Sequence, residues 1–123
     1  SNLNKCDQSV TSRLVVENED KGCWNVTNLL KHFELPITFD NLHHKCNHDE
    51  QISCELAAMD WCADTWLNVK PLYHYSESHP DKTNPRAHAD MPTECPVNEA
   101  YDWDIELKSK DAAIRACAAL VGV

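Results

Sequence analysis

The clearest helical pattern of apolar and polar positions covers residues 50–67. Two opposite stripes of this segment both carry apolar side chains at helical spacing. The first stripe consists of Ile52, Leu56, Met59, Ala63 and Trp66, and the second of Cys54, Ala57, Ala58, Trp61 and Cys62. Asp49 is placed to cap the N-terminus. Because a helix that is apolar on two faces is normally covered on both sides, we expect this helix at the centre of the fold.

Two further helices are predicted. One lies between Asn25, a good N-cap residue, and Pro36, which cannot continue a helix. Its apolar positions follow the spacing i, i+3, i+4, i+7: Val26, Leu29, Leu30 and Phe33. The other is a C-terminal helix at about 110–121, with Ser109 as its cap and Gly122 at its end.

Alternation of apolar and polar residues predicts strands elsewhere. It is most regular where Tyr101, Trp103, Ile105 and Leu107 alternate with Asp102, Asp104 and Glu106. Residues 9–17 alternate less regularly, and residues 37–39 form a short apolar run, so we expect a strand at each. Residues 68–99 show no periodicity and hold five of the six prolines, which predicts a long irregular loop.

These elements predict an α+β fold in which a small sheet packs against the central helix, 50–67, and the C-terminal helix. A length of 123 residues suits one domain rather than two. We therefore expect a single domain spanning 1–123, stapled by disulfides.

The charge balance limits the classes of binding partner that we expect. The chain has 11 Lys and Arg against 20 Asp and Glu, a formal net charge of −9. An acidic surface repels phosphate backbones and anionic headgroups, so no nucleic-acid and no membrane partner is expected. The chain has only 2 glycines, which excludes the glycine-built cofactor and nucleophile motifs. No cofactor is expected.

The cysteines suggest an oxidising compartment. Seven are dispersed along the chain without a C-x-x-C pair: Cys6, Cys23, Cys46, Cys54, Cys62, Cys95 and Cys117. This pattern in a short chain is typical of a disulfide framework, so we expect six of them to pair. Cys54 and Cys62 lie too far apart on one helix to bond each other. The odd cysteine leaves a disulfide-linked homodimer open, although a monomer is favoured.

Other features agree with secretion. The sequon Asn25-Val26-Thr27 predicts glycosylation of Asn25, which would make the chain a glycoprotein. No signal peptide is present and the first residue is Ser1, so we expect a mature, extracellular form whose leader was removed.

In size, acidity, dispersed cysteines and lack of an enzyme motif, the chain resembles the small cysteine-rich effectors secreted by plant-pathogenic fungi. The resemblance assigns no residue. It implies a secreted, effector-like or toxin-like virulence protein that binds a host or partner protein and is not an enzyme. The expected binding surface is on the long loop: Tyr73, His74, Tyr75, His79 and His88.

Two alternatives remain open. One is a secreted hydrolase in which His74, His79 or His88 acts in acid–base chemistry. The other is an extracellular metal-binding protein that uses His43, His44 and His48. The acidic row Asp102, Asp104 and Glu106 could also bind a cation, but it is more typical of the solvent-exposed face of a half-buried strand.

Overall fold

Four short parallel strands form the centre of the protein, described here from a computed structural model that covers residues 2–52 and 54–122. β1 (Val16–Glu17) pairs with β2 (Ile37–Thr38), and β3 (Leu72–Tyr75) pairs with β4 (Asp102–Ile105). A parallel bridge between Asp40 and His74 joins the two pairs, with the His74 N–H donating to the Phe39 carbonyl at 2.9 Å. The strands therefore lie side by side in chain order, and their carboxyl ends meet at one edge.

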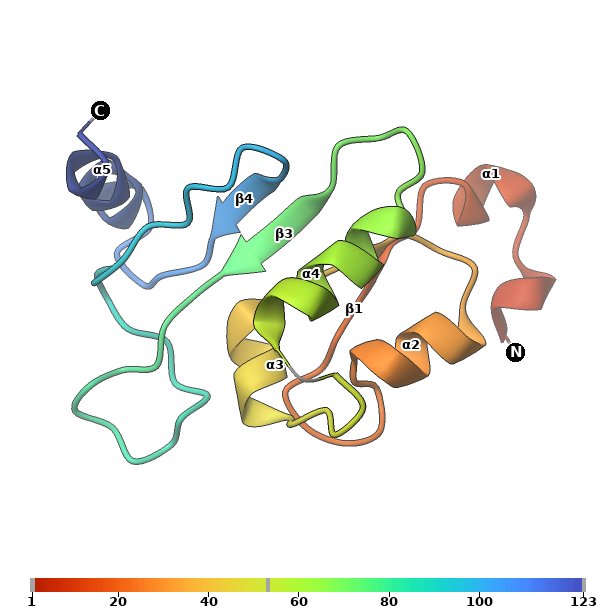
Figure 1. Cartoon of the computed structure of the whole chain (residues 1–123), viewed down its shortest axis with the longest axis horizontal. Helices are drawn as coiled ribbons and strands as arrows, with labels where there is room; N and C mark the ends of the chain where they lie inside the picture. The colour runs from red at the N-terminus through yellow and green to blue at the C-terminus, as the bar shows by residue number, and fades with distance from the viewer. Residues whose placement is uncertain (1, 53, 123) are drawn as a thin grey trace.

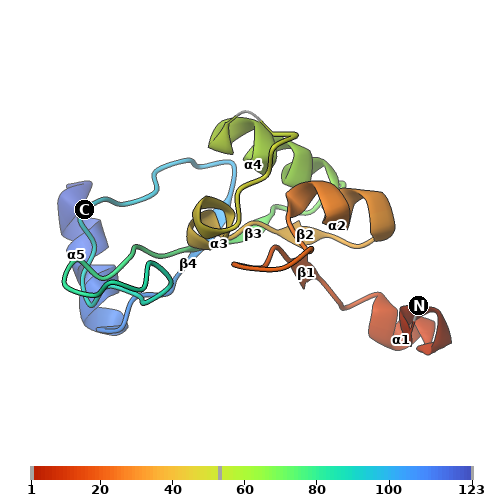
Figure 2. The same ribbon diagram turned by 90° about the horizontal axis from the view of Figure 1, so that it is seen from below.

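Besides the strands, the described residues form six helical segments (Figure 1). They are η1 (Asn2–Lys5), α1 (Gln8–Thr11), α2 (Val26–His32), α3 (Asn41–Cys46), α4 (Glu55–Asp64) and α5 (Asp111–Leu120). The turned view places α2 and α4 on the same side of the strands, while α5 lies at the other end of the molecule from the N-terminus (Figure 2). Among the described residues, no helix is long and apolar enough to cross a bilayer.

The core lies between the strands and the helices α2 and α4. Its buried residues are Val26, Leu29, Ile37, Phe39, Ile52, Ala58, Met59, Cys62, Tyr73 and Tyr101. The fully buried Tyr73 satisfies its hydroxyl by donating to the Met59 carbonyl at 2.6 Å. Because α4 supplies both that carbonyl and the buried Cys62, this contact fixes α4 against β3.

Two predicted elements differ from the structure at their ends. The helix expected over 50–67 is confined to Glu55–Asp64, and Leu56 and Trp61 on its outer face are 67% and 47% exposed. It is thus covered on one side only. Residues 9–17 contain a helical turn and only two strand residues, because Val10 is 48% exposed and has no neighbouring strand to pack against.

The expected long loop contains a strand. β3 lies inside 68–99, directly after Pro71, and pairs on both sides. The strand has only four residues, Leu72–Tyr75, which is too short for a clear alternating pattern. Its pairing partners lie about thirty residues away in each direction along the chain, so local periodicity did not reveal it.

The expected disulfide framework is absent. All seven cysteines are free thiols. Cys62 and Cys117 are buried and pack as small apolar side chains, and burial raises the pKa of Cys62 to about 12. The cysteines therefore give no support for an oxidising compartment.

Candidate metal centre

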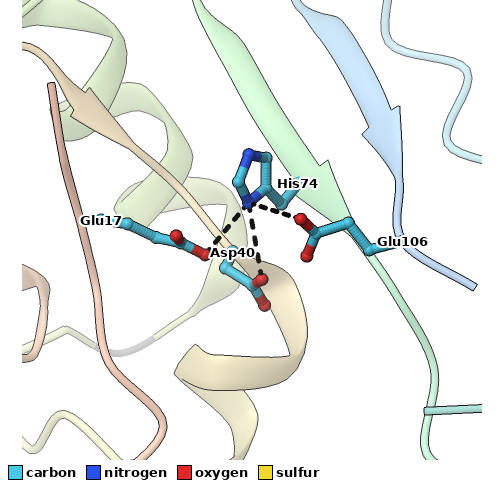
Figure 3. A group of neighbouring side chains, drawn as sticks. All are labelled: Glu17, Asp40, His74 and Glu106. Carbon is cyan, nitrogen blue, oxygen red and sulfur yellow. Dashed lines mark hydrogen bonds and ion pairs between the residues drawn. The ribbon is translucent and has the colours of Figure 1, made fainter.

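Four metal-ligating side chains converge where the parallel strands end (Figure 3). Glu17 is the last residue of β1, and His74 lies on β3. Asp40 follows β2 after one intervening residue, and Glu106 follows β4 directly. One ligand atom from each of them lies within 4.8 Å of the others. Side chains at the carboxyl ends of adjacent parallel strands point into the same space, so the sheet itself assembles the group.

His74 is at the centre of the cluster. Its Nδ1 lies 3.0 Å from Glu17 Oε1, 3.4 Å from Glu106 Oε1 and 4.0 Å from Asp40 Oδ2. The hydrogen bond to Glu17, reinforced by the neighbouring negative charges, raises the pKa of His74 to about 9. Burial opposes ionisation of Glu17, but the hydrogen bond and charge of His74 leave its pKa lowered.

Asp40 is the most enclosed member. Its side chain is fully buried, and this burial raises its pKa to about 6. Its Oδ1 accepts a hydrogen bond from the His43 N–H at the start of α3, whereas Oδ2 is buried without a hydrogen-bond partner. A buried carboxylate oxygen without a partner is costly unless something positively charged meets it.

These residues fit a divalent cation. Three carboxylates face one imidazole, so the cluster carries more negative than positive charge even when His74 is protonated. Carboxylate oxygen and imidazole nitrogen together suit ions such as Mn²⁺ and Zn²⁺. The free Asp40 Oδ2 is directed at the same group of atoms, 4.0 Å from His74 Nδ1.

Two asparagines hold the strand ends in place. The Asn18 amide donates to the Asp40 carbonyl at 3.0 Å and accepts from the Asp40 N–H at 2.8 Å. Asn41 makes the same pair of bonds to the backbone of Ser76, at 3.0 and 2.9 Å. Each asparagine directly follows a cluster carboxylate, Glu17 or Asp40, and links its strand to the next one.

The predicted metal-binding histidines do not converge with one another as expected. Residues 41–46, which include His43 and His44, form the helix α3. Only His43 faces the cluster, with Nε2 3.7 Å from Asp40 Oδ2. His44 instead packs on Phe39, with 5.4 Å between ring centroids, and His48 lies beyond the helix.

The predicted binding surface is only partly on the surface. Tyr73 belongs to the core, Tyr75 donates its hydroxyl to Glu77 at 2.8 Å, and His74 joins the cluster. His79 and His88 are half-buried in the loop after β3, outside the group of four.

The three residues of the acidic row, on β4 and directly after it, have different partners. Asp102 pairs with Lys70 at 3.1 Å, Asp104 Oδ2 lies 3.8 Å from His74 Nε2, and Glu106 is a cluster member.

Asn25 of the sequon caps a helix. The Asn25 side chain accepts from the Asn28 N–H as the cap of α2, and Thr27 is buried with its hydroxyl bonded to Asp49. The cap uses Asn25 Oδ1, whereas a glycan would be attached at Nδ2, so glycosylation of Asn25 stays a prediction.

Glu17 and Asp40 were missed as site residues. One signal was available: each follows a short β-branched or aromatic run and precedes asparagine, in Val-Val-Glu-Asn and Thr-Phe-Asp-Asn. Such a repeat at two strand ends marks equivalent positions in successive strands of a parallel sheet.

Comparisons with known proteins agree on one family. The family model for the UV-endonuclease UvdE matches residues 1–122. Two curated UV DNA damage endonucleases of Bacillus anthracis, one from strain A0248, are 29% identical over 127 residues, which is 92% of this chain and 39% of each relative. The crystal structure of SacUVDE is 26% identical with a TM-score of 0.81, and the match covers 98% of this chain and 43% of that one. The chain thus spans about two fifths of the length of these relatives.

These matches overturn several expectations. The resemblance to fungal effectors is wrong, and so are the secreted localisation, the virulence role and the function as a non-catalytic binding protein, because the matching family is one of endonucleases. The exclusion of nucleic acid in favour of a protein partner is wrong too. Net charge averages over the whole chain and does not show how charge is distributed on its surface.

Proposed function

Since the chain belongs to the UV-endonuclease UvdE family, we propose that it carries metal-binding residues of an endonuclease that acts on UV-damaged DNA. The observation that carries this proposal is the cluster of Glu17, Asp40, His74 and Glu106 at four neighbouring strand ends. A nuclease must stabilise negative charge on a phosphodiester, and a cation held by such a cluster is a common means of doing so.

Each residue has a defined part. Glu17, Asp40 and Glu106 would offer oxygen ligands, and His74 would offer Nδ1, the nitrogen that faces all three carboxylates. The cation, when bound, polarises a phosphate oxygen and makes a coordinated water more acidic.

The surrounding residues keep these ligands in position. Asn18 fixes the backbone of Asp40, and the His43 N–H holds Asp40 Oδ1, so that Oδ2 stays directed at the site. Outer contacts of this kind orient ligands and tune their affinity for the metal.

The experiment compares cleavage of UV-irradiated and unirradiated supercoiled plasmid, with Mn²⁺ present or removed by EDTA. We expect nicking of the irradiated plasmid only, and only with metal. Asp40→Asn is expected to abolish it, because one charged ligand is lost with little change in shape.

Asp102→Asn is the matched control. It removes an exposed carboxylate from β4 that pairs with Lys70 and lies outside the cluster, so nicking should be unchanged. Metal-independent nicking, equal nicking of both plasmids, or full activity of Asp40→Asn would each contradict the proposal.

A further inference from the structure

A hollow of about 600 Å³ borders the cluster on the β4 side. Its lining includes the cluster carboxylate Glu106 and a second carboxylate, Asp104. A ligand in this hollow would lie next to the candidate metal centre. Two lysines, Lys108 and Lys110, line the same hollow and bring two ammonium groups beside these carboxylates.

These lysines are exposed and, among the described residues, have no carboxylate within ion-pair distance. Lys108 is fixed in place by its backbone N–H, which donates to the Ala89 carbonyl at 3.0 Å.

A third lysine reaches the same place from the loop after β3. Ladder-like bonds hold this loop: the His79 N–H donates to the Ala87 carbonyl at 2.7 Å, and the Ala89 N–H to the Glu77 carbonyl at 2.8 Å. In this loop the exposed Lys82 lies close to Lys108, and the side-chain hydrogen bond with Lys108, followed by its like charge, lowers the pKa of Lys82. Asp90 offsets this effect only in part, and two neighbouring ammonium groups suit an anion.

The backbone conformation at Lys110 is a further observation about this hollow. Its φ is 48° and its ψ −114°, a conformation that glycine adopts freely and a side chain adopts only under strain. The sequence nevertheless has lysine there, at the rim of the hollow.

We propose that Lys108 and Lys110, assisted by Lys82, bind backbone phosphates of the DNA strand beside the metal centre. This inference rests on the proposed function and extends it to the substrate. The carboxylates of the cluster repel a polyanion, and the lysines beside them offer ammonium groups that attract its phosphates. Contacts with phosphate position the strand without reading its sequence.

The test measures binding of a fluorescein-labelled, UV-irradiated duplex as a function of salt concentration, by anisotropy. In the double variant Lys108→Ala/Lys110→Ala, the slope of log affinity against log salt should become shallower by about 2, because each lost phosphate contact removes about one released counterion. Affinity at low salt should fall at least tenfold, and Lys108→Arg/Lys110→Arg should retain both values.

Two further variants separate binding from folding. Lys110→Gly removes the ammonium and relieves the backbone, so it should keep or raise the melting temperature while it still makes the slope shallower. Lys5→Ala removes an exposed lysine at the opposite end of the molecule and should change neither quantity.

Mn²⁺ titrations of the same variants keep this inference distinct from the proposed function. Alanine variants that bind Mn²⁺ normally but show the shallower slope support the phosphate site. An unchanged slope, or a wild-type protein that does not bind the duplex even at low salt, would overturn it. Loss of Mn²⁺ binding in Asp40→Asn would still support the metal centre in either case.

Discussion

Asn18 and Asp40 are joined by two hydrogen bonds that continue the pairing of β1 and β2 by means of a side chain. The Asn18 amide meets both the carbonyl and the N–H of Asp40, at 3.0 and 2.8 Å, and Asn18 is 1% exposed. The same amide connects the residue after Glu17 to Asp40, so two cluster carboxylates are held in register by one buried group. The geometry of the candidate metal centre therefore depends on a residue that is not a ligand.

We predict that Asn18→Ala weakens both the fold and the metal site. Leaving the buried N–H and carbonyl of Asp40 without partners should lower the free energy of unfolding by about 2–3 kcal/mol. Affinity for Mn²⁺ should fall at least tenfold, because Asp40 is no longer oriented. Urea denaturation and calorimetric titration measure the two effects.

Asn47→Ala is the control for this variant. Asn47 also donates two hydrogen bonds to backbone carbonyls, those of Glu19 and Gly22, but the bonds are solvent-exposed and distant from the cluster. It should leave Mn²⁺ affinity unchanged. If Asn18→Ala bound Mn²⁺ as tightly as the wild type, Asn18 would have no positioning role.

A second prediction concerns acid stability. The buried Asp49 carboxylate accepts from the N–H and hydroxyl of Thr27 and from the Gln51 N–H. Burial opposes its ionisation, but these bonds lower its pKa below the ordinary value of 3.8. A carboxylate with a lowered folded-state pKa stabilises the fold above its unfolded pKa and loses that contribution as pH falls through the folded pKa.

Asp49→Asn should therefore destabilise the protein by about 1–3 kcal/mol at neutral pH and flatten the loss of stability below pH about 4. Urea denaturation at several pH values tests this. Glu50→Gln, which changes the exposed neighbour, should keep the wild-type pH profile. A wild-type acid dependence in Asp49→Asn would rule out this role for Asp49.

A third prediction concerns the loop that follows residue 90. The Glu77 carboxylate accepts from the N–H and hydroxyl of Thr93, from the Glu94 N–H and from the Tyr75 hydroxyl. We expect Glu77→Ala to raise amide exchange at residues 92–96 at least tenfold, since the loop loses its anchor to the end of β3. Hydrogen–deuterium exchange measures this, and Glu99→Ala, an exposed change in the same loop, is the control. Equal exchange in the two variants would mean that the loop is held by other contacts.

The thiols give a fourth prediction. Cys6, Cys23 and Cys54 are exposed and should react quickly with a thiol reagent in the native protein. Cys62 and Cys117 should react only on unfolding, because burial raises their pKa values to about 12 and about 11. Intact mass should be identical with and without reductant. An increase in mass on reduction, by two hydrogen atoms for each bond, would reveal a disulfide and contradict the free thiols.

Local signals in the sequence carry part of this structure. Asn25 as a cap and Pro36 as a stop bracket α2, and the alternation from Tyr101 to Leu107 contains β4, because caps, stops and period-two patterns act between near neighbours. β3 has no such signal. Tyr73 is buried through contacts with α4 and Tyr101, both distant in sequence.

For the same reason, only two of the four cluster residues could be recognised from the sequence. His74 and Glu106 drew notice for their own chemistry, whereas Glu17 and Asp40 stand alone in the sequence and meet them only through the parallel register of the strands. Counting cysteines was misleading, because a free thiol in an apolar core and a disulfide partner look alike in composition.

The most direct test of the metal centre is an anomalous difference map from crystals of the protein soaked in Mn²⁺. We predict a peak between Glu17, Asp40, His74 and Glu106, about 2.0–2.3 Å from their ligand atoms. No peak should be present there in crystals of Asp40→Asn. A soaked wild-type crystal with no peak among these four side chains, or with its Mn²⁺ bound elsewhere, would contradict the assignment of this cluster as the metal centre.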